Sequence, residues 1–339
     1  MNAIQDWLAG AAVAPLLADS EFPLLITQLE PIPDLVGWAA AHRASFDQLV
    51  HQHGALLFRG FSVRTAAQFE AFVDSLCTAD WVEYREAATP RSHVQGRVFT
   101  STEYYPELRI YVHNENSHVT SWPLYVFFYC QSPAEQGGLT PISDCRRIYS
   151  RLPTHVLQRF VRDGWLYRRN FYPGSSMTWQ KAFGTQSRLE VDRYCHENHM
   201  TAQWDGEVLT VRYRRWAALK HPRTHDMVWF NHGTFFNPYT LDSTLKKTVL
   251  VMGEDRLPYN TYYGDGSGIE EETMKILDEA YATATVSYPW QAGDVLMLDN
   301  MRIAHGRTPY RGQREVFVAM KHKVRCSELA DYDQYAAPV

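Results

Sequence analysis

The stretch Ile110-Tyr111-Val112-His113-Asn114-Glu115 joins an apolar strand to two side chains that can bind a metal. Successive side chains of an extended strand point to opposite faces, so His113 and Glu115 are expected on one face and Asn114 on the other. One imidazole and one carboxylate on a shared face can bind the same metal. The stretch therefore predicts part of a metal site, and a third ligand has to come from elsewhere in the chain.

His305 is the best candidate for the third ligand. It lies 192 residues downstream of His113 (305 − 113), in Asp299-Asn300-Met301-Arg302-Ile303-Ala304-His305-Gly306-Arg307. Two histidines and one carboxylate form a facial triad that leaves three metal positions open, the arrangement of non-haem Fe(II) oxygenases. An H-x-E pattern is common by itself, so this prediction depends on the rest of the sequence.

The composition is that of a soluble globular protein, with 339 residues of which 45% are apolar and 21% charged. A net charge of −5 without a run of Lys or Arg disfavours nucleic acid or an anionic membrane as partner. No apolar run approaches the ~18 residues of a membrane span, and the first residues lack the basic segment of a signal peptide. Five scattered cysteines without a C-x-x-C pair predict buried free thiols in a reducing compartment. We therefore expect a cytoplasmic protein.

Short strands are expected along most of the chain, whereas residues 1 to about 50 are expected to be mainly helical or irregular. Apolar spacing followed by Gly54 predicts a helix over 36–51, and Thr65 is a suitable N-cap for a helix that ends near Cys77. The polar segment 116–123 is expected at the mouth of a substrate pocket. The other expected helices are 151–163 and 269–280, and the expected strands are 55–61, 109–113, 124–130, 207–213, 227–231, 294–298 and 314–324.

These elements predict a mainly β protein with flanking helices and a double-sheet jelly roll at its core. A jelly roll brings the two ends of the β region side by side, which would place His305 opposite His113. No repeat, low-complexity segment or flexible linker divides the chain, so residues 1–339 are expected to form one domain. The segment at about 146–290 is then a long insert between core strands.

Three groups of residues together resemble the TauD/TfdA superfamily of Fe(II)/2-oxoglutarate-dependent dioxygenases, which have a double-stranded β-helix (jelly-roll) core. They are His113-x-Glu115, Gly137-Gly138-x-Thr140-Pro141 and Asp299-Asn300…His305-Gly306-Arg307…Arg314. Within the superfamily, the chain is similar to the SyrP-like (clavaminate synthase-like) natural-product hydroxylases. That similarity runs from about Leu56 to Met320 and is carried by Thr100-Ser101-Thr102-Glu103-Tyr104, His113-Asn114-Glu115, Trp122-Pro123 and Trp229-Phe230-Asn231.

The resemblance implies that His113, Glu115 and His305 bind Fe(II), and that Thr140 and Arg314 hold the distal carboxylate of the cosubstrate 2-oxoglutarate. A planar guanidinium matches a carboxylate in a bidentate manner, and a hydroxyl completes such a site. Many superfamily members carry Asp where Glu115 stands. Arg314 follows His305 by only nine residues (314 − 305), so Arg311 and Arg307 remain alternatives.

The resemblance further implies that 2-oxoglutarate and O2 take the open metal positions, and that decarboxylation to succinate and CO2 drives hydroxylation of a C–H bond. The substrate is then an amino acid or amino-acid derivative in natural-product biosynthesis, free or tethered to a carrier protein. Desaturation, cyclisation and epoxidation use the same metal site and stay open. Related halogenases carry a small residue in place of the carboxylate, so Glu115 predicts oxygenation and not halogenation.

Two other classes of function fit parts of the sequence. A metal-binding cupin-like module without redox chemistry needs the histidines but neither Thr140 nor Arg314. The cluster Cys195-His196-Glu197-Asn198-His199 suggests a zinc hydrolase. Its spacing is H-E-x-H, however, and not the H-E-x-x-H that places two histidines one helical turn apart. A solvated helix face is the simpler interpretation of this cluster. The candidate substrate contacts are Tyr104, Trp122 and His232, with core packing as the alternative for each.

Overall fold

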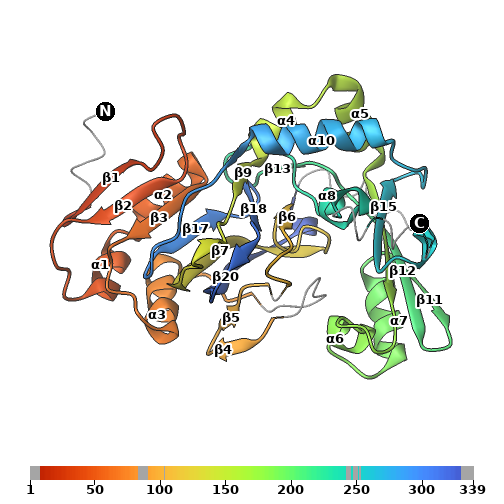
Figure 1. Ribbon diagram of the computed structural model, residues 1–339, viewed down its shortest axis with the longest axis horizontal. Helices are drawn as coiled ribbons and strands as arrows, with labels where there is room; N and C mark the ends of the chain where they lie inside the picture. Colours follow the sequence, from red (N-terminus) through yellow and green to blue (C-terminus); the bar gives the residue numbers. More distant parts are fainter. Residues whose placement is uncertain are drawn as a thin grey trace.

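The computed structural model describes residues 8–82, 91–102, 104–241, 246, 251 and 253–329. Two sheets lie at the centre of the molecule, between the N-terminal helices on one side and most of the segment 146–290 on the other (Figure 1). The described chain is mostly sheet with flanking helices, as the sequence predicted.

The large sheet contains eight strands from both ends of the chain. Their order is β1 (Ala11–Pro15), β2 (Leu24–Gln28), β3 (Ala55–Arg59), β17 (Val295–Asp299), β7 (Ser121–Ser132), β20 (Glu315–Arg325), β5 (Val98–Thr100) and β4 (His93–Gln95). Neighbouring strands are antiparallel except for the parallel pair β2 and β3. The central strands β3, β17 and β7 are almost continuously apolar and buried, which is typical of strands covered on both faces.

The small sheet places the two predicted histidine ligands opposite each other. Its four antiparallel strands have the order β16 (Thr285–Val286), β9 (Ile142–Asp144), β18 (Ile303–Arg307) and β6 (Ile110–His113). His305 pairs directly with His113, as the sequence predicted. The register then shifts at Gly306, where a Cβ atom would lie 2.6 Å from the carbonyl oxygen of Ile110, so only glycine fits this bulge.

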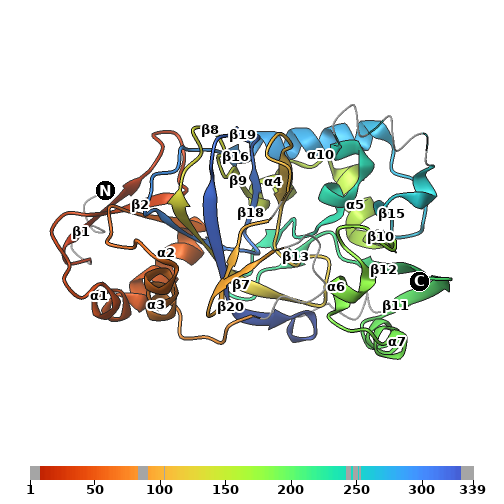
Figure 2. The ribbon, with the colours of Figure 1, turned by 60° about the horizontal axis from the view of Figure 1, so that its bottom comes forward.

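Most of the segment 146–290 forms a layer of its own (Figure 2). Its sheet has the order β11 (Met200–Asp205), β12 (Val208–Arg215), β10 (Trp165–Phe171) and β15 (Tyr259–Tyr263). Gly206 lies in the turn between β11 and β12 with a φ of 57°. The helices predicted over 151–163 and 269–280 appear as α5 (Thr154–Asp163) and α10 (Glu271–Thr283), whereas α4 (Cys145–Arg151) was not predicted. The shorter elements are α6 (Trp179–Phe183), α7 (Arg188–Glu197), β13 (Leu219–Lys220), β14 (Met227–Val228), α8 (Gly233–Phe236), η1 (Pro238–Thr240) and η2 (Glu254–Arg256).

The N-terminal helices are α1 (Leu35–Ala41), α2 (Arg43–His53) and α3 (Ala66–Leu76). As predicted, Gly54 ends α2 in a left-handed conformation with a φ of 81°, and Thr65 caps α3 by accepting a hydrogen bond from the Gln68 N–H at 3.2 Å. Phe58 of β3 packs edge-to-face on Phe46 of α2 and Phe72 of α3, with ring centroids 5.2 and 5.3 Å apart. These contacts fix the helices against one end of the large sheet.

Three local predictions need correction. Strands β1 and β2 lie in the first 50 residues, where no strand was predicted, because each has only five residues and neither shows a clear alternation of apolar and polar side chains. The strand expected over 227–231 is reduced to the two residues of β14. Residues 116–120 form a turn before β7, and the segment lines a second pocket, beside His199 and Lys323, rather than the mouth of the pocket that His113 and His305 line. The composition of residues 81–98 is typical of a loop, but β4 lies within this stretch, and its residues 83–90 lie outside the described part of the chain.

All five cysteines are buried and free, as predicted. In the part of the chain that the structure describes, no helix combines the length and apolar character needed to cross a membrane.

Candidate active site

The three predicted metal ligands converge beside the small sheet. His113, Glu115 and His305 are all buried, and one ligand atom from each lies within 4.8 Å of the others. They form the only such group of three or more His, Cys, Asp or Glu side chains among the described residues. Two imidazoles and one carboxylate at this spacing can hold a single metal ion.

Glu115 reaches the site from a turn and not from the strand, which corrects the strand-face prediction. β6 ends at His113, and the following turn includes Asn116 with a left-handed φ of 56°. Asn300 holds this turn, because its Oδ1 accepts the Glu115 N–H at 2.7 Å and its Nδ2 donates to the Glu115 carbonyl at 2.9 Å. The buried Asn300 amide therefore fixes the Glu115 backbone at both of its polar groups.

Both imidazoles are held as neutral groups. His113 Nδ1 donates to the Tyr111 carbonyl at 2.8 Å, which leaves Nε2 with the lone pair that a metal needs. The His305 ring packs on Phe128 of β7 with centroids 4.9 Å apart, and its Nε2 lies 3.9 Å from Glu115 Oε2. Burial lowers the pKa of His113 and lowers that of His305 well below its usual value. Metals bind the neutral form of imidazole, so this environment suits a ligand.

Arg91 contacts the same carboxylate and was not predicted from the sequence. Its Nη2 donates to Glu115 Oε2 at 2.6 Å, and the two side chains are only 3% and 4% exposed. The guanidinium offsets the charge of Glu115, which would be costly to bury alone. Arg91 lies outside every motif of the sequence, so no pattern marked it.

Thr140 and Arg314 lie on one wall of the pocket next to the histidines. Arg314 Nη2 lies 3.4 Å from Thr140 Oγ1, to which Trp290 Nε1 also donates at 2.9 Å. Arg314 Nε donates to the Gly138 carbonyl at 2.9 Å, and a Cβ at Gly138 would lie 2.9 Å from Arg314 Cδ. Burial lowers the pKa of Arg314 to about 10, so the guanidinium stays charged at neutral pH.

The two alternative arginines are placed differently from Arg314. Arg307 lines the pocket, but its guanidinium donates to the carbonyls of Tyr104, Tyr105 and Leu108 at 3.1, 2.5 and 2.9 Å. Arg311 is exposed in β19 (Tyr310–Arg311), which pairs with β8 (Gln136–Gly137). Of the three, only Arg314 has a guanidinium at hydrogen-bonding distance from Thr140 in the described chain.

The three candidate substrate contacts fall in different places. Tyr104 is 37% exposed, and its carbonyl anchors Arg307 at the pocket. His232 is buried beside His113 with ring centroids 4.8 Å apart. Trp122 is fully buried, with its ring 5.3 Å from that of Trp216, and it does not line the pocket. Trp122 is therefore a core residue, which corrects its assignment as a candidate substrate contact.

The rival zinc cluster does not form a metal site among the described residues. Cys195 is buried in α7, whereas His196 and Glu197 at the end of that helix and the following His199 are exposed. This arrangement fits the interpretation of a solvated helix face.

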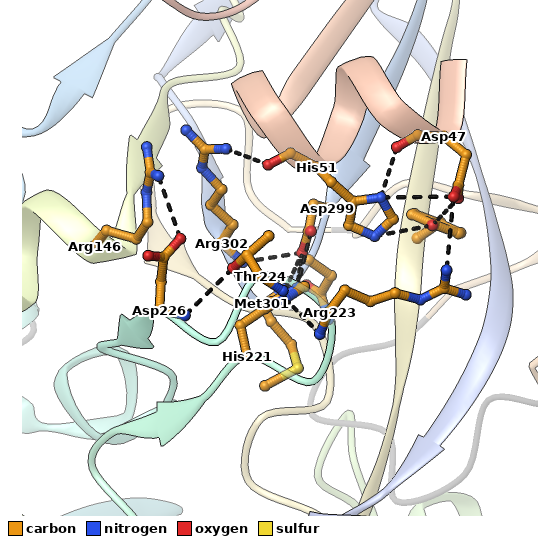
Figure 3. A network of polar contacts seen from close by, with 12 residues as sticks. Asp47, His51, Arg146, His221, Arg223, Thr224, Asp226, Asp299, Met301 and Arg302 are labelled. Atoms are coloured by element: carbon orange, nitrogen blue, oxygen red, sulfur yellow. Dashed lines mark hydrogen bonds and ion pairs between the residues drawn. The ribbon is translucent and has the colours of Figure 1, made fainter. Parts of the chain in front are cut away.

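A buried network supports the turn that carries Asn300 (Figure 3). Asp299 forms an ion pair with His221, with 3.0 Å between Oδ2 and Nε2, and its Oδ1 accepts the Arg302 N–H at 3.2 Å. Burial by itself raises the pKa of Asp299, but the contacts with His221 outweigh burial, and the pKa is lowered. Arg302 in turn donates to the His51 carbonyl of α2 at 2.6 Å. The network ties the active-site turn to the N-terminal helices.

Acid is expected to destabilise the fold through the buried histidines. Burial lowers the pKa of His113, His232 and His305, so below pH 6.5 the unfolded chain binds protons that the folded chain does not. Each such group reduces the free energy of unfolding by about 1.4 kcal/mol per pH unit between pH 6.5 and its lowered pKa. The free energy of unfolding is measured in urea without added metal at pH 6.5 and at pH 5.5. Its decrease between the two pH values should be roughly 1 kcal/mol smaller in His232→Gln than in wild type. An identical loss in both proteins would contradict the prediction.

The chain is similar to known proteins in sequence family, in individual relatives and in fold. Residues 26–320 match the sequence model of the family described as taurine catabolism dioxygenase TauD, TfdA family. The chain is 34% identical to the dapdiamide synthesis protein DdaC of Enterobacter agglomerans, covering 91% of this chain and 93% of that protein. It is 30% identical to a clavaminate synthase-like protein of Arabidopsis thaliana, covering 91% and 92%. The crystal structure of PvcB from Pseudomonas aeruginosa shares the fold, with a TM-score of 0.58 and 16% identity over 96% of this chain and 97% of PvcB.

The site and the fold define an oxygenase of the non-haem iron class, and the chain belongs to the TauD, TfdA family of dioxygenases. It is a 2-oxoglutarate-dependent oxygenase that uses Fe(II), 2-oxoglutarate and O2.

Proposed function

We propose that this protein hydroxylates an unactivated C–H bond of an amino acid or amino-acid derivative in natural-product biosynthesis. One observation carries the proposal: the ligand atoms of His113, Glu115 and His305 meet within 4.8 Å, beside a pocket wall formed by Thr140 and Arg314. The relative DdaC is a dapdiamide synthesis protein, and PvcB comes from an isonitrile synthetic pathway. Both names support a biosynthetic role that concerns small molecules.

His113, Glu115 and His305 are the proposed iron ligands. The donor set fits Fe(II), because it combines two neutral imidazoles with one carboxylate and leaves coordination positions for a cosubstrate. Bound Fe(II) supplies the activation of O2, which is coupled to decarboxylation of 2-oxoglutarate to succinate and CO2. The protein keeps both histidines unprotonated by burial and holds Glu115 in place through Asn300.

Thr140 and Arg314 are proposed to bind the distal carboxylate of 2-oxoglutarate. The Thr140 oxygen accepts hydrogen bonds from Trp290 and Arg314, so its own O–H proton is directed to another acceptor. A carboxylate there would accept hydrogen bonds from the Thr140 hydroxyl and the charged Arg314 guanidinium, in the pocket that His113 and His305 also line. The keto-acid end of the same molecule then faces the metal ligands.

In the proposed reaction one oxygen atom of O2 enters the substrate as a hydroxyl group, and the other enters succinate. Ile110, Phe128 and Val316 give the pocket an apolar lining that excludes water from the reacting C–H bond. Tyr104 and His232 are the retained candidates for substrate contacts. Because Glu115 occupies the carboxylate position, we expect an oxygenated product and not a chlorinated one. Desaturation, cyclisation and epoxidation are the alternative outcomes at the same site.

We also infer that the two central sheets form a double-stranded β-helix within one domain. His305 of β18 contacts Phe128 of β7, so the small sheet faces the large sheet across the site. The family match over 26–320 spans both sheets and the segment 146–290, which supports an insert within a single domain. Five buried free thiols support a location in the reducing cytoplasm.

Anaerobic titration of metal-free protein with Fe(II) and then 2-oxoglutarate tests the proposal through the visible charge-transfer band of the chelate. Arg314→Gln is expected to raise the Kd for 2-oxoglutarate by about 100-fold, because two charge-assisted hydrogen bonds are lost. The matched control Arg311→Gln removes an exposed arginine and should change that Kd by less than about 2-fold. Absence of the band in wild type would reject the proposed function, and a larger effect of Arg311→Gln would reject the assigned arginine.

The non-redox alternative makes a different prediction in the same experiment. A cupin-like metal-binding module has no use for Thr140 and Arg314, so neither variant would alter ligand binding. A zinc hydrolase would retain zinc after purification and would not respond to 2-oxoglutarate.

A further inference from the structure

His221 is a buried histidine of the segment 146–290, and the proposed function assigns it no role. It lies in the loop 221–226 between β13 and β14 and is 1% exposed. Its Nε2 donates to Asp299 Oδ1 at 3.2 Å and lies 3.0 Å from Asp299 Oδ2 (Figure 3). The contact joins the segment 146–290 to the end of β17, directly before the turn that carries Asn300.

The loop that contains His221 fixes both the tautomer and the direction of the imidazole. The His221 Nδ1 atom accepts the backbone N–H groups of Arg223 and Thr224 at 3.2 and 3.1 Å (Figure 3). A neutral imidazole carries one proton, so the proton is on Nε2 and is donated to Asp299. The His221 backbone N–H closes the loop by donating to the Asp226 carbonyl at 2.8 Å. His221 therefore presents a fixed hydrogen-bond donor to Asp299.

Asp299 transmits this contact to the turn 300–302. It is fully buried, and among the described residues His221 is the only side chain that donates a hydrogen bond to its carboxylate. The same Oδ1 accepts the backbone N–H groups of Met301 and Arg302 at 3.1 and 3.2 Å. A buried carboxylate that loses one of its donors is destabilised. Without His221, the carboxylate would rotate toward another donor or take up a proton, and its hold on the turn would weaken.

The turn in its turn positions the Asn300 amide. The Asn300 backbone N–H donates to the Leu124 carbonyl at 2.8 Å, and its side chain bonds the N–H and the carbonyl of Glu115 at 2.7 and 2.9 Å. A continuous series of hydrogen bonds therefore runs from His221 to the backbone of Glu115. Groups that orient a metal ligand in this way influence metal affinity by 10–100-fold.

We propose that His221 is a positioning residue for the metal site. Through Asp299 and Asn300 it fixes the backbone of Glu115, so that the carboxylate meets His113 and His305. The proposal rests on the proposed function, in which Glu115 binds iron. The segment 146–290 thereby contributes to the metal site without supplying a ligand.

The test compares three variants with wild type. His221→Phe keeps a planar ring but removes both polar atoms, whereas His221→Gln retains an N–H donor and an acceptor. Arg59→Met is the matched control, because Arg59 donates to the buried Asp294 carboxylate at 2.9 and 2.7 Å. Asp294 stands directly before β17, about 16 Å along the strand from Asp299. His221→Phe and Arg59→Met should both lower the midpoint of urea unfolding.

Two measurements separate positioning from folding. The first is the hydrogen-exchange rate of the Glu115 amide, followed by NMR in metal-free protein labelled with ¹⁵N-glutamate. The second is the Kd for Co(II), followed by its d–d spectrum without oxygen. His221→Phe should raise both quantities by about 10-fold or more, and His221→Gln should return both to within about 3-fold of wild type. Arg59→Met should leave both within about 2-fold of wild type.

Equal exchange rates and equal Co(II) affinities in His221→Phe and Arg59→Met would show that His221 only stabilises the fold. Faster exchange in His221→Phe with an unchanged Kd for Co(II) would also overturn the proposal, because the Glu115 backbone would then be held without consequence for the metal. If His221→Phe does not fold, His221→Asn takes its place, since its amide is too short to reach Asp299.

The proposed function is tested separately by the charge-transfer band of wild type with Fe(II) and 2-oxoglutarate. Absence of that band would reject the proposed function and, with it, a role of His221 at an iron site. A normal band together with unchanged exchange and Co(II) affinity in the His221 variants would reject the positioning role alone.

Discussion

Replacing His305 with alanine is expected to abolish Fe(II) binding and, with it, the 2-oxoglutarate charge-transfer band and succinate formation. The His305 side chain is one of three buried groups whose ligand atoms lie within 4.8 Å of one another. Losing a hydrogen-bond partner of a metal ligand costs 10–100-fold in affinity, so losing a ligand itself should weaken Fe(II) binding by more than about 100-fold. The measurement is the Kd for Fe(II) under anaerobic conditions, with succinate release as the second readout.

Two further variants separate ligation from folding. Alanine also leaves a cavity beside Phe128, with an expected cost of about 2–4 kcal/mol, whereas His305→Gln keeps most of the volume and still lacks the imidazole. Both variants should therefore lose Fe(II) to a similar extent. The exposed His196 belongs to the rival cluster in α7, and His196→Ala should retain wild-type binding. Metal loss in the His196 variant, with retention in the His305 variants, would contradict the assigned site and favour a zinc site.

The sequence predicted the central strands and the meeting of the two histidines because both depend on strong patterns. β3, β7 and β17 are apolar runs whose burial follows from their composition. The pairing of His305 with His113 was expected from the jelly-roll arrangement that the motifs resemble, and the register confirms it. Helix ends at Gly54 and Thr65 were predictable because each residue acts on the adjacent backbone.

Features that depend on contacts between distant residues were not predictable in the same way. Glu115 was expected to reach the site along a strand, but Asn300, 185 residues away in the chain, holds it in a turn. Arg91 lies outside every motif, and its importance follows only from its contact with Glu115. Trp290 stabilises Thr140 across 150 residues. No local periodicity records these hydrogen bonds, so the sequence indicated the three side chains that converge at the proposed metal site, but not the groups that orient them.

Replacing Asn300 with alanine is expected to have the largest effect on stability. Asn300 is fully buried, and its amide bonds the Glu115 N–H at 2.7 Å, the Glu115 carbonyl at 2.9 Å and the Pro123 carbonyl at 2.9 Å. Each of these three buried backbone groups left without a partner costs about 1–3 kcal/mol, so the free energy of unfolding should fall by roughly 3–9 kcal/mol. Urea unfolding of wild type and Asn300→Ala, both without added metal, measures this change.

Asn170 offers a matched control for the role of Asn300 at the metal site. Asn170 is also buried. Its Nδ2 donates to two backbone carbonyls, and its Oδ1 accepts a hydrogen bond from the Thr210 hydroxyl. It lies in β10, in the four-stranded sheet that is separate from the small sheet at the metal site. Asn170→Ala should therefore lose comparable stability and keep wild-type Fe(II) affinity. Asn300→Ala should in addition weaken Fe(II) binding by about 10–100-fold, because Glu115 loses its fixed backbone. Equal Fe(II) affinities in the two variants would mean that Glu115 reaches the metal without help from Asn300.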